Sequence, residues 1–165
     1  MTERDTRARE LEVRLDALHH VGITVADLDR SVEFYTALTG GAVMFSEPMR
    51  GPRVAAHMAI DDPGLDLRFA MIRINNTILE LIEFTRPRGE RRFSWANTNA
   101  GAVHLAFEVP DIAAAHRRLS EAGMTFVAEP YTFVEEDDAP DVVGATFAYF
   151  TDPDGLRLEI FQPAS

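Results

Sequence analysis

The sequence predicts an α+β fold made of two tandem βαβββ modules. Residues 20–28 and 104–112 resemble each other, since each is a short apolar run that opens with a histidine and closes with an aspartate and an aliphatic residue. All matched residues are separated by the same number of positions along the chain. A repeat that is longer than a solenoid unit indicates duplication of a half-domain. The halves also end alike, with one glutamate inside the apolar runs at residues 79–82 and 158–161.

The first half opens with a predicted strand and helix. A β-rich run at residues 18–25 precedes Asp27, whose short carboxylate suits a helix N-cap. Apolar residues at helical spacing predict a helix over residues 28–38. Gly40 and Gly41 follow, and glycine supplies the positive φ that ends a helix.

Three strands complete the first half. They are predicted at residues 42–45, 67–74 and 77–84, and the last two form a hairpin around a pair of asparagines. Residues 48–64 are rich in Pro, Gly and Asp. They predict a mobile loop with a short strand near residues 54–60.

The second half repeats this order. Residues 102–109 predict a strand, Asp111 the helix cap, and residues 112–122 the helix. Further strands are predicted at residues 125–128, 145–151 and 156–161. The turn at residues 152–155 has proline early and glycine late, as its φ values require. Residues 131–144 carry an acidic run and predict a solvated loop.

The composition limits the kinds of partner. At 165 residues, 46% hydrophobic and 26% charged, the chain fits one globular domain of ordinary size. A formal net charge of −11 argues against a nucleic-acid partner, which needs clustered Lys and Arg. Because there is no cysteine, disulfides, a thiolate nucleophile and a Cys-based zinc site are excluded. Any metal is therefore expected to have nitrogen and oxygen ligands.

The sequence does not predict a membrane association. Residues 1–15 lack the apolar core of a secretory signal, and no apolar run approaches the length of a membrane span. The expected location is the cytoplasm. Residues 7–18 predict either a short helix with a leucine stripe or a frayed extension.

The expected layout is one domain with an extension at its N-terminus. The extension covers residues 1–16, and the domain covers residues 17–163. Its modules are residues 17–85 and 101–163, joined by a polar linker at residues 86–100.

Strand alternation predicts where the two histidines point. His20 shares a strand face with Gly22, and His104 shares one with Ala106, while large apolar residues take the opposite face. The apolar face is expected to lie under the helix. Each histidine is therefore predicted on the open face, beside small residues that leave room for a ligand.

The two strand glutamates need a partner. Glu80 and Glu159 each stand between two large aliphatic residues, and an unpaired carboxylate in such a setting costs several kcal/mol or is protonated. A lone strand histidine is usually a core residue, and a lone strand glutamate is usually at an edge or paired with Arg. The corresponding positions in both halves instead favour a metal site. Two imidazoles and two carboxylates suit Zn, Ni, Fe, Co or Mn.

Three segments carry a family resemblance. Residues 20–35, 101–112 and 150–159 resemble the vicinal oxygen chelate superfamily, which includes glyoxalase I, methylmalonyl-CoA epimerase, extradiol dioxygenases, fosfomycin-resistance transferases and bleomycin-binding proteins. The resemblance covers about residues 17–163. It implies that the sheets of both modules curl around a divalent metal, with homodimers common. The implied ligands are His20, Glu80, His104 and Glu159.

The same resemblance bears on the substrate. A His/Glu/His/Glu set is similar to that of bacterial-type glyoxalase I, in which an Asn four residues after the first Glu helps to hold glutathione. Here that residue is Phe84, so a less polar small-molecule substrate is expected. The residues expected to contact it are Phe84, Ile82 and Phe161, with Trp95 at the mouth of the site.

The resemblance implies a lyase or isomerase of glyoxalase type that works through a metal-bound enediolate on a carbonyl substrate. Glu159 or Glu80 would act as the general base. One alternative is an Fe(II) extradiol-type dioxygenase, which would need His20, His104 and Glu159 only. Another is a non-catalytic protein that binds a small molecule such as an antibiotic.

Overall fold

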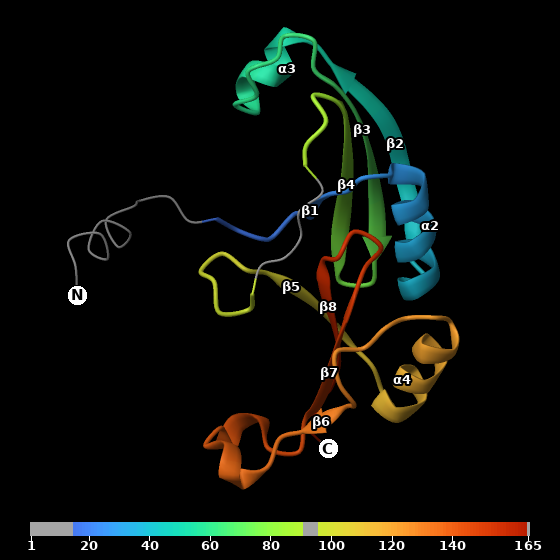
Figure 1. Ribbon diagram of the computed structural model, residues 1–165, viewed down its shortest axis with the longest axis vertical. Helices are drawn as coiled ribbons and strands as arrows, with labels where there is room; N and C mark the ends of the chain where they lie inside the picture. The colour runs from blue at the N-terminus through green and yellow to red at the C-terminus, as the bar shows by residue number, and fades with distance from the viewer. Residues whose placement is uncertain (1–14, 91–95, 165) are drawn as a thin grey trace, which may run out of the picture. The chain divides into compact units, whose positions relative to one another are not determined.

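The computed structural model describes residues 15–90 and 96–164. The chain divides into two compact units, Met1–Pro87 and Arg88–Ser165. Each unit builds its own four-stranded mixed sheet with one long helix, in the order strand, helix, three strands (Figure 1). The predicted α+β class with two βαβββ modules is confirmed.

The sheet of the first unit has one parallel and two antiparallel pairings. Its strands, in spatial order, are β1 (Val21–Thr24), β4 (Thr77–Arg86), β3 (Asp66–Ile74) and β2 (Ala42–Arg50). β1 runs parallel to β4, while β3 pairs antiparallel with both β4 and β2. The predicted hairpin of β3 and β4 is confirmed.

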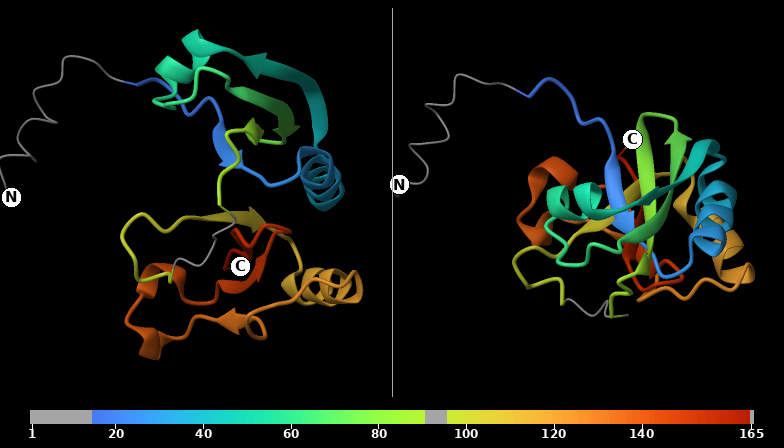
Figure 2. Two further views of the ribbon diagram at one scale, coloured as in Figure 1. Left: turned by 45° about the horizontal axis from the view of Figure 1, so that its top comes forward. Right: turned by 90° about the horizontal axis from the view of Figure 1, so that it is seen from above.

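Helix α2 (Leu28–Thr39) covers one face of this sheet (Figure 2). It begins where the Asp27 carboxylate accepts a hydrogen bond from the Arg30 amide, and it ends at Gly40, whose φ is 67°. Leu28 and Tyr35 are buried on its inner side. Both ends of the helix lie within a residue of the prediction.

Two segments of the first unit differ from the prediction. β2 continues to Arg50, well beyond the predicted end at residue 45. Where a short strand was predicted, the chain forms helix α3 (Pro52–His57). The strand prediction was wrong because proline is favoured in the first helical turn and the alanines that follow favour a helix.

The second unit repeats the topology. Its strands, in spatial order, are β5 (His104–Glu108), β8 (Arg157–Gln162), β7 (Thr146–Thr151) and β6 (Tyr131–Thr132). β5 runs parallel to β8, and the other pairs are antiparallel. Helix α4 (Ile112–Glu121) begins where Asp111 accepts a hydrogen bond from the Ala114 amide. The predicted cap is therefore confirmed.

The outer edge of the second sheet differs from the prediction. Residues 125–128 do not form a strand, and Phe126 makes only an isolated bridge to Phe150. The edge strand is instead the short β6. Two 3₁₀ turns follow it, η1 (Glu135–Asp137) and η2 (Pro140–Val142). The acidic loop thus carries local structure.

The last strand of each unit supports the helix of that unit in the same way. Glu83 in β4 accepts a hydrogen bond from the Leu28 amide at 3.2 Å. Gln162 in β8 accepts one from the Ile112 amide at 2.8 Å. Each side chain satisfies an exposed N–H group of the first helical turn, which ties the helix to its sheet.

The N-terminal extension falls mostly outside the described residues, and residues 15–18 have no regular secondary structure. In the described part of the chain, no helix is long and apolar enough to cross a membrane.

A buried hydroxyl in α2 generates a stability prediction. Ser31 is 0% exposed, and among the described residues its Oγ finds no hydrogen-bond partner. Ser31→Ala should leave the free energy of unfolding unchanged or raise it by about 1 kcal/mol, because an unpaired hydroxyl is no longer buried. Urea denaturation measures this.

The matched control is Thr39→Ala. The Thr39 hydroxyl donates to the Tyr35 carbonyl at 2.6 Å and accepts from the Gly41 amide at 3.1 Å. That variant should lose about 1 kcal/mol. A loss of similar size in Ser31→Ala would mean that its hydroxyl is satisfied.

The turn after β6 generates a pH prediction. The Asp137 carboxylate accepts from the Val134 amide and from the Tyr131 hydroxyl, and these bonds hold the pKa of Asp137 below its ordinary value. The stabilisation is present above the unfolded-state pKa of about 4 and is lost as the pH falls through the folded value. Tyr131→Phe should therefore raise the pKa of Asp137, as measured by carboxyl ¹³C NMR.

Asp62 serves as the internal control for that titration. Its pKa is also lowered, by hydrogen bonds from Arg86 and from the Gly64 amide in the first unit. It should titrate identically in both proteins. An unchanged Asp137 midpoint in Tyr131→Phe would contradict the assignment.

Candidate metal centre

Each unit brings together one histidine and one glutamate that the sequence singles out. In the first unit, His20 Nε2 lies 3.3 Å from Glu80 Oε2. In the second, His104 Nε2 lies 3.1 Å from Glu159 Oε2. These two histidine–glutamate pairs join the same chemical groups at similar nitrogen–oxygen distances.

The sheet register explains why the pairs match. Glu80 lies opposite Gly22, and Glu159 lies opposite Ala106, so each glutamate faces the residue two positions after the histidine. In a parallel pair, residues two apart share a face, which places the imidazole diagonal to the carboxylate. His20 precedes β1 by one residue, and His104 is the first residue of β5.

The pairs lie on the face away from the helix, as strand alternation predicts. Ile23 in β1 and Leu158 in β8 point the other way and are buried. Gly22 and Ala106 are exposed. Each pair therefore opens onto space that a ligand can enter.

The donor spacing fits a metal ion. Two donors about 2.1 Å from one ion lie about 3.0 Å apart at a right angle and about 3.4 Å apart at the tetrahedral angle. The spacings of 3.1 and 3.3 Å fall in this range. A neutral imidazole nitrogen beside a carboxylate oxygen is a donor set that suits divalent transition metals.

Each pair supplies two donors. Within residues 15–90 and 96–164, there is no cluster of three or more His, Cys, Asp or Glu side chains that could hold a metal ion. One pair alone therefore falls short of the three or four protein ligands that zinc-type centres need.

The two carboxylates differ in their surroundings. The Glu159 side chain is 9% exposed and that of Glu80 is 21% exposed. Tyr149 in β7 lies opposite Glu159, whereas Met71 in β3 lies opposite Glu80. Burial raises the pKa of the Tyr149 hydroxyl, and the charge of Glu159 and a hydrogen bond with it raise the pKa further. Glu159 is thus the more enclosed of the two.

His19 contacts the first pair, which strand alternation did not predict. His19 Nδ1 lies 2.8 Å from His20 Nδ1, and the two rings meet edge to face. This contact leaves His20 Nε2 directed toward Glu80. A hydrogen bond at the second ring nitrogen fixes the tautomer and orientation of a metal-binding histidine.

The predicted substrate residues of the first unit lie on the same strand face as Glu80. Ile82 and Phe84 follow it at alternate positions in β4, opposite Phe69 and Leu67 of β3. Both pack against a cluster of Ala55, Leu65 and Leu67 that includes α3. This cluster therefore already covers part of the apolar strand face beside Glu80.

In the second unit, Phe161 lies two residues after Glu159 in β8 and opposite Phe147. Trp95, predicted at the mouth of the site, lies outside the described residues. The sequence analysis missed Phe147 and Tyr149, which share the face of Glu159. Their alternate positions within residues 145–151 were the available signal.

Comparison with known proteins gives a consistent result. The profile of the Glyoxalase/Bleomycin resistance protein/Dioxygenase superfamily matches residues 17–160. The chain is 34% identical over 150 residues to a 2-epi-5-epi-valiolone epimerase from an Actinomyces species, covering 88% of this chain and 79% of that protein. It is 27% identical over 153 residues to a probable lactoylglutathione lyase from Synechocystis, covering 90% of this chain and 96% of that protein.

A solved structure shows the same fold. The crystal structure of a glyoxalase family protein from Bacillus cereus matches with a TM-score of 0.76 at 18% identity. The match covers 94% of this chain and 99% of that one. At this identity the likeness shows the fold alone.

The register of the first pair generates a prediction at Gly22. A Cβ added there would lie 3.4 Å from Glu80 Oε2, an ordinary contact, and Ala106 already occupies the matching position in the second unit. Gly22→Ala should therefore fold normally and gain about 0.4–1 kcal/mol, because the unfolded chain loses freedom. Thermal unfolding of the two proteins measures this. A destabilisation above about 1 kcal/mol would show that Glu80 cannot accommodate the methyl group.

Proposed function

Because the chain belongs to the Glyoxalase/Bleomycin resistance protein/Dioxygenase superfamily, we propose that it is a metal-dependent isomerase or lyase that removes a proton from the carbon beside a carbonyl group. Two relatives support an enzyme of this kind, since one is named an epimerase and the other a probable lactoylglutathione lyase. An epimerase that inverts a C–H centre must remove the proton and return it on the opposite face. The proposed proton transfer is common to such reactions.

The observation that carries the proposal is the matched pair of histidine–glutamate contacts. Members of the superfamily typically use divalent metal ions. The proposed ligands are His20, Glu80, His104 and Glu159, which would join at one ion either within a chain or across two copies in a homodimer. Such a set leaves positions open for substrate on a five- or six-coordinate ion.

The bound ion, the imidazoles and the carboxylates would each have a separate role in the reaction. A bound divalent ion would supply Lewis acidity toward a carbonyl and an adjacent oxygen, an effect worth several kcal/mol. The two imidazoles, whose Nε2 atoms face the glutamates, would bind the ion, and the contact with His19 would keep the His20 ring in place. A carboxylate oxygen of Glu159 or Glu80 accepts the proton from carbon.

The two glutamates suit a reaction that moves a proton between faces. A positioned carboxylate contributes about 10²–10⁴ in rate as a general acid or base. If one glutamate removes the proton and the other returns it, the product is the epimer. If a single glutamate does both, the proton moves within one face, as a lyase or isomerase of glyoxalase type requires.

The strand faces favour a partly apolar substrate. Ile82 and Phe84 adjoin Glu80, and Phe161 adjoins Glu159. The net charge of −11 also disfavours strongly anionic compounds. A neutral carbonyl compound with a second oxygen on the neighbouring carbon meets both conditions.

Deuterium exchange tests the proposed reaction without knowledge of the natural substrate. The full-length protein, loaded with Ni, Zn, Co, Mn or Fe, is incubated in D₂O with hydroxyacetone and 2-hydroxyacetophenone, and exchange beside the carbonyl is followed by NMR. We expect metal-dependent exchange. Glu159→Gln or Glu80→Gln should slow it about 10²-fold or more, since the general base is lost.

Metal content and oxygen uptake complete this experiment. Gln variants that keep a full complement of metal and exchange at the wild-type rate would remove both glutamates from the role of base. Metal-dependent oxygen uptake with catechol, without exchange, would favour the extradiol dioxygenase instead.

A further inference from the structure

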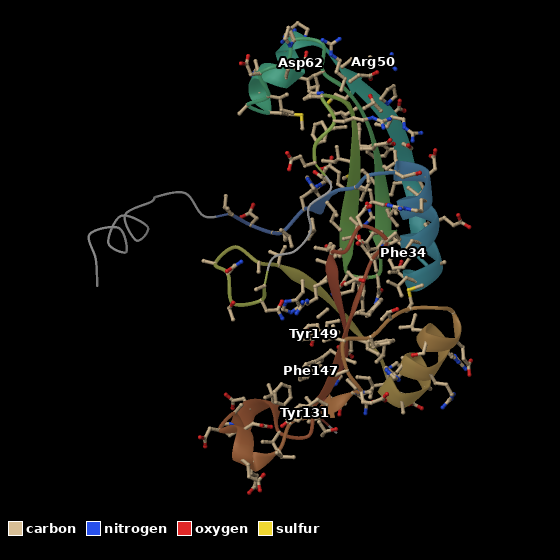
Figure 3. The ribbon with its side chains drawn as sticks, viewed as in Figure 1. Phe34, Arg50, Asp62, Tyr131, Phe147 and Tyr149 are labelled. Carbon is tan, nitrogen blue, oxygen red and sulfur yellow. The ribbon has the colours of Figure 1, made fainter. Side chains whose placement is uncertain are left out.

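Four aromatic side chains form a continuous strip in the second unit. The aromatic strip consists of Tyr149, Phe147, Phe133 and Tyr131. The Tyr149 and Phe147 ring centroids lie 5.3 Å apart, and Phe147 stacks on Phe133 at 5.1 Å. Tyr131 closes the strip, 5.9 Å from Phe147 and 5.8 Å from Phe133. Figure 3 shows Tyr149, Phe147 and Tyr131 following one another from β7 toward β6.

The strip begins at the histidine–glutamate pair of its own unit. The His104 ring meets the Tyr149 ring edge to face at 5.5 Å. Tyr149 lies opposite Glu159, and Phe147 lies opposite Phe161. All these residues therefore share the face of the sheet that carries Glu159.

The helix does not cover this face. Phe150 follows Tyr149 in β7 and Leu158 precedes Glu159 in β8, so both side chains point to the other side of the sheet, and both are 0% exposed. Phe147 and Tyr149 are half-buried, and Tyr131 is 44% exposed. A ligand can therefore reach the rings of the aromatic strip, but it cannot reach the buried rings of the core.

The matching strand face of the first unit has a different composition, although Phe69 lies opposite Ile82 there and meets Phe45 edge to face at 5.9 Å. Met71 lies opposite Glu80, where the second unit has Tyr149. Further along, Leu67 and Phe84 pack under α3 in the apolar cluster. Among the described residues, the first copy thus has a mixed aliphatic and aromatic face that packs partly on α3, and the second copy has a continuous row of rings.

We propose that the aromatic strip is a subsite for a flat, uncharged ring of the substrate, whose two neighbouring oxygens lie at His104 and Glu159. This inference rests on the proposed function. Aromatic rings pair in offset or edge-to-face arrangements at centroid distances of about 4.5–7 Å, the range already seen within the strip. A ligand ring beside Phe147 would extend the same packing.

The far end of the strip limits the charge of that ring. The Tyr131 hydroxyl donates to the Asp137 carboxylate at 2.7 Å. Asp137 belongs to the acidic run at residues 135–138. A carboxylate or phosphate on the ligand ring would be repelled there, so the expected ligand class is a neutral aromatic or ring-shaped carbonyl compound.

Two hydroxamates test the subsite by binding rather than by turnover. Acetohydroxamate and benzohydroxamate present the same two neighbouring oxygens and differ by a methyl group against a ring. Calorimetric titration of the metal-loaded, full-length protein should show benzohydroxamate binding at least about tenfold more tightly. Phe147→Leu should reduce this ratio to about threefold or less and leave acetohydroxamate affinity unchanged.

Phe126→Leu is the matched control. Phe126 lies in the same unit and contacts two rings, those of His116 and Phe150. Phe126 forms an isolated backbone β-bridge with Phe150, whose side chain is buried on the face away from the strip. This variant should keep the wild-type ratio. Phe133→Leu provides a second strip variant if Phe147→Leu does not fold, because its ring stacks on Phe147.

The outcomes separate this inference from the proposed function. Two results would overturn the subsite only, provided that both hydroxamates bind in a metal-dependent manner. In the first, the ratio of benzohydroxamate to acetohydroxamate affinity is unchanged in the strip variants. In the second, Phe126→Leu reduces this ratio as much as the strip variants do. Failure of both compounds to bind in a metal-dependent manner would overturn the metal site and the subsite together. Light scattering that shows Phe147→Leu turning a dimer into a monomer at an unchanged ratio would identify the strip as an interface instead.

Benzohydroxamate with a 4-carboxylate tests the charge limit. It should bind more weakly than benzohydroxamate to the wild-type protein, since its added charge points along the strip toward the acidic turn. Equal or tighter binding would contradict the assignment of a neutral ring.

Discussion

A carboxylate on an apolar strand must have a partner, and this constraint applies once in each unit. Glu80 and Glu159 stand in strands whose neighbours are buried aliphatic residues, and each meets a histidine nitrogen within 3.3 Å. The parallel register between the first and last strands of each unit makes this contact possible. In each unit, the first turn of the helix is tied to the sheet by a side chain from the last strand and is capped by an aspartate.

Duplication supplied the scaffold, and divergence altered what surrounds it. In the first unit, Ile82, Phe84 and Phe69 beyond Glu80 pack against the apolar cluster that includes α3. In the second, the row beyond Glu159 consists of partly exposed rings that end at an acidic turn. One histidine–glutamate pair therefore lies beside a mixed apolar surface that packs against α3, and the other lies beside a continuous row of aromatic rings. This difference, more than the pairs themselves, carries information about the substrate.

Sequence reasoning captured the features that repeat. The halves, their helices and the faces of His20 and His104 followed from alternation and capping residues, which are local signals. It missed α3, because a Pro-rich, Gly-rich stretch was interpreted as a loop although Pro52 opens a helical turn. It also missed Tyr149, because the partner of Glu159 across the strand pair depends on register rather than on order along the chain.

We propose that both histidine–glutamate pairs serve one metal ion. Titration of the metal-free protein with Ni or Zn, in the wild type and in His20→Ala and His104→Ala, tests this most directly. We expect one ion per chain and a loss of affinity of 100-fold or more in each variant, since each variant removes a ligand of the same ion. Two ions per chain, with each variant losing one and keeping the other at unchanged affinity, would contradict it.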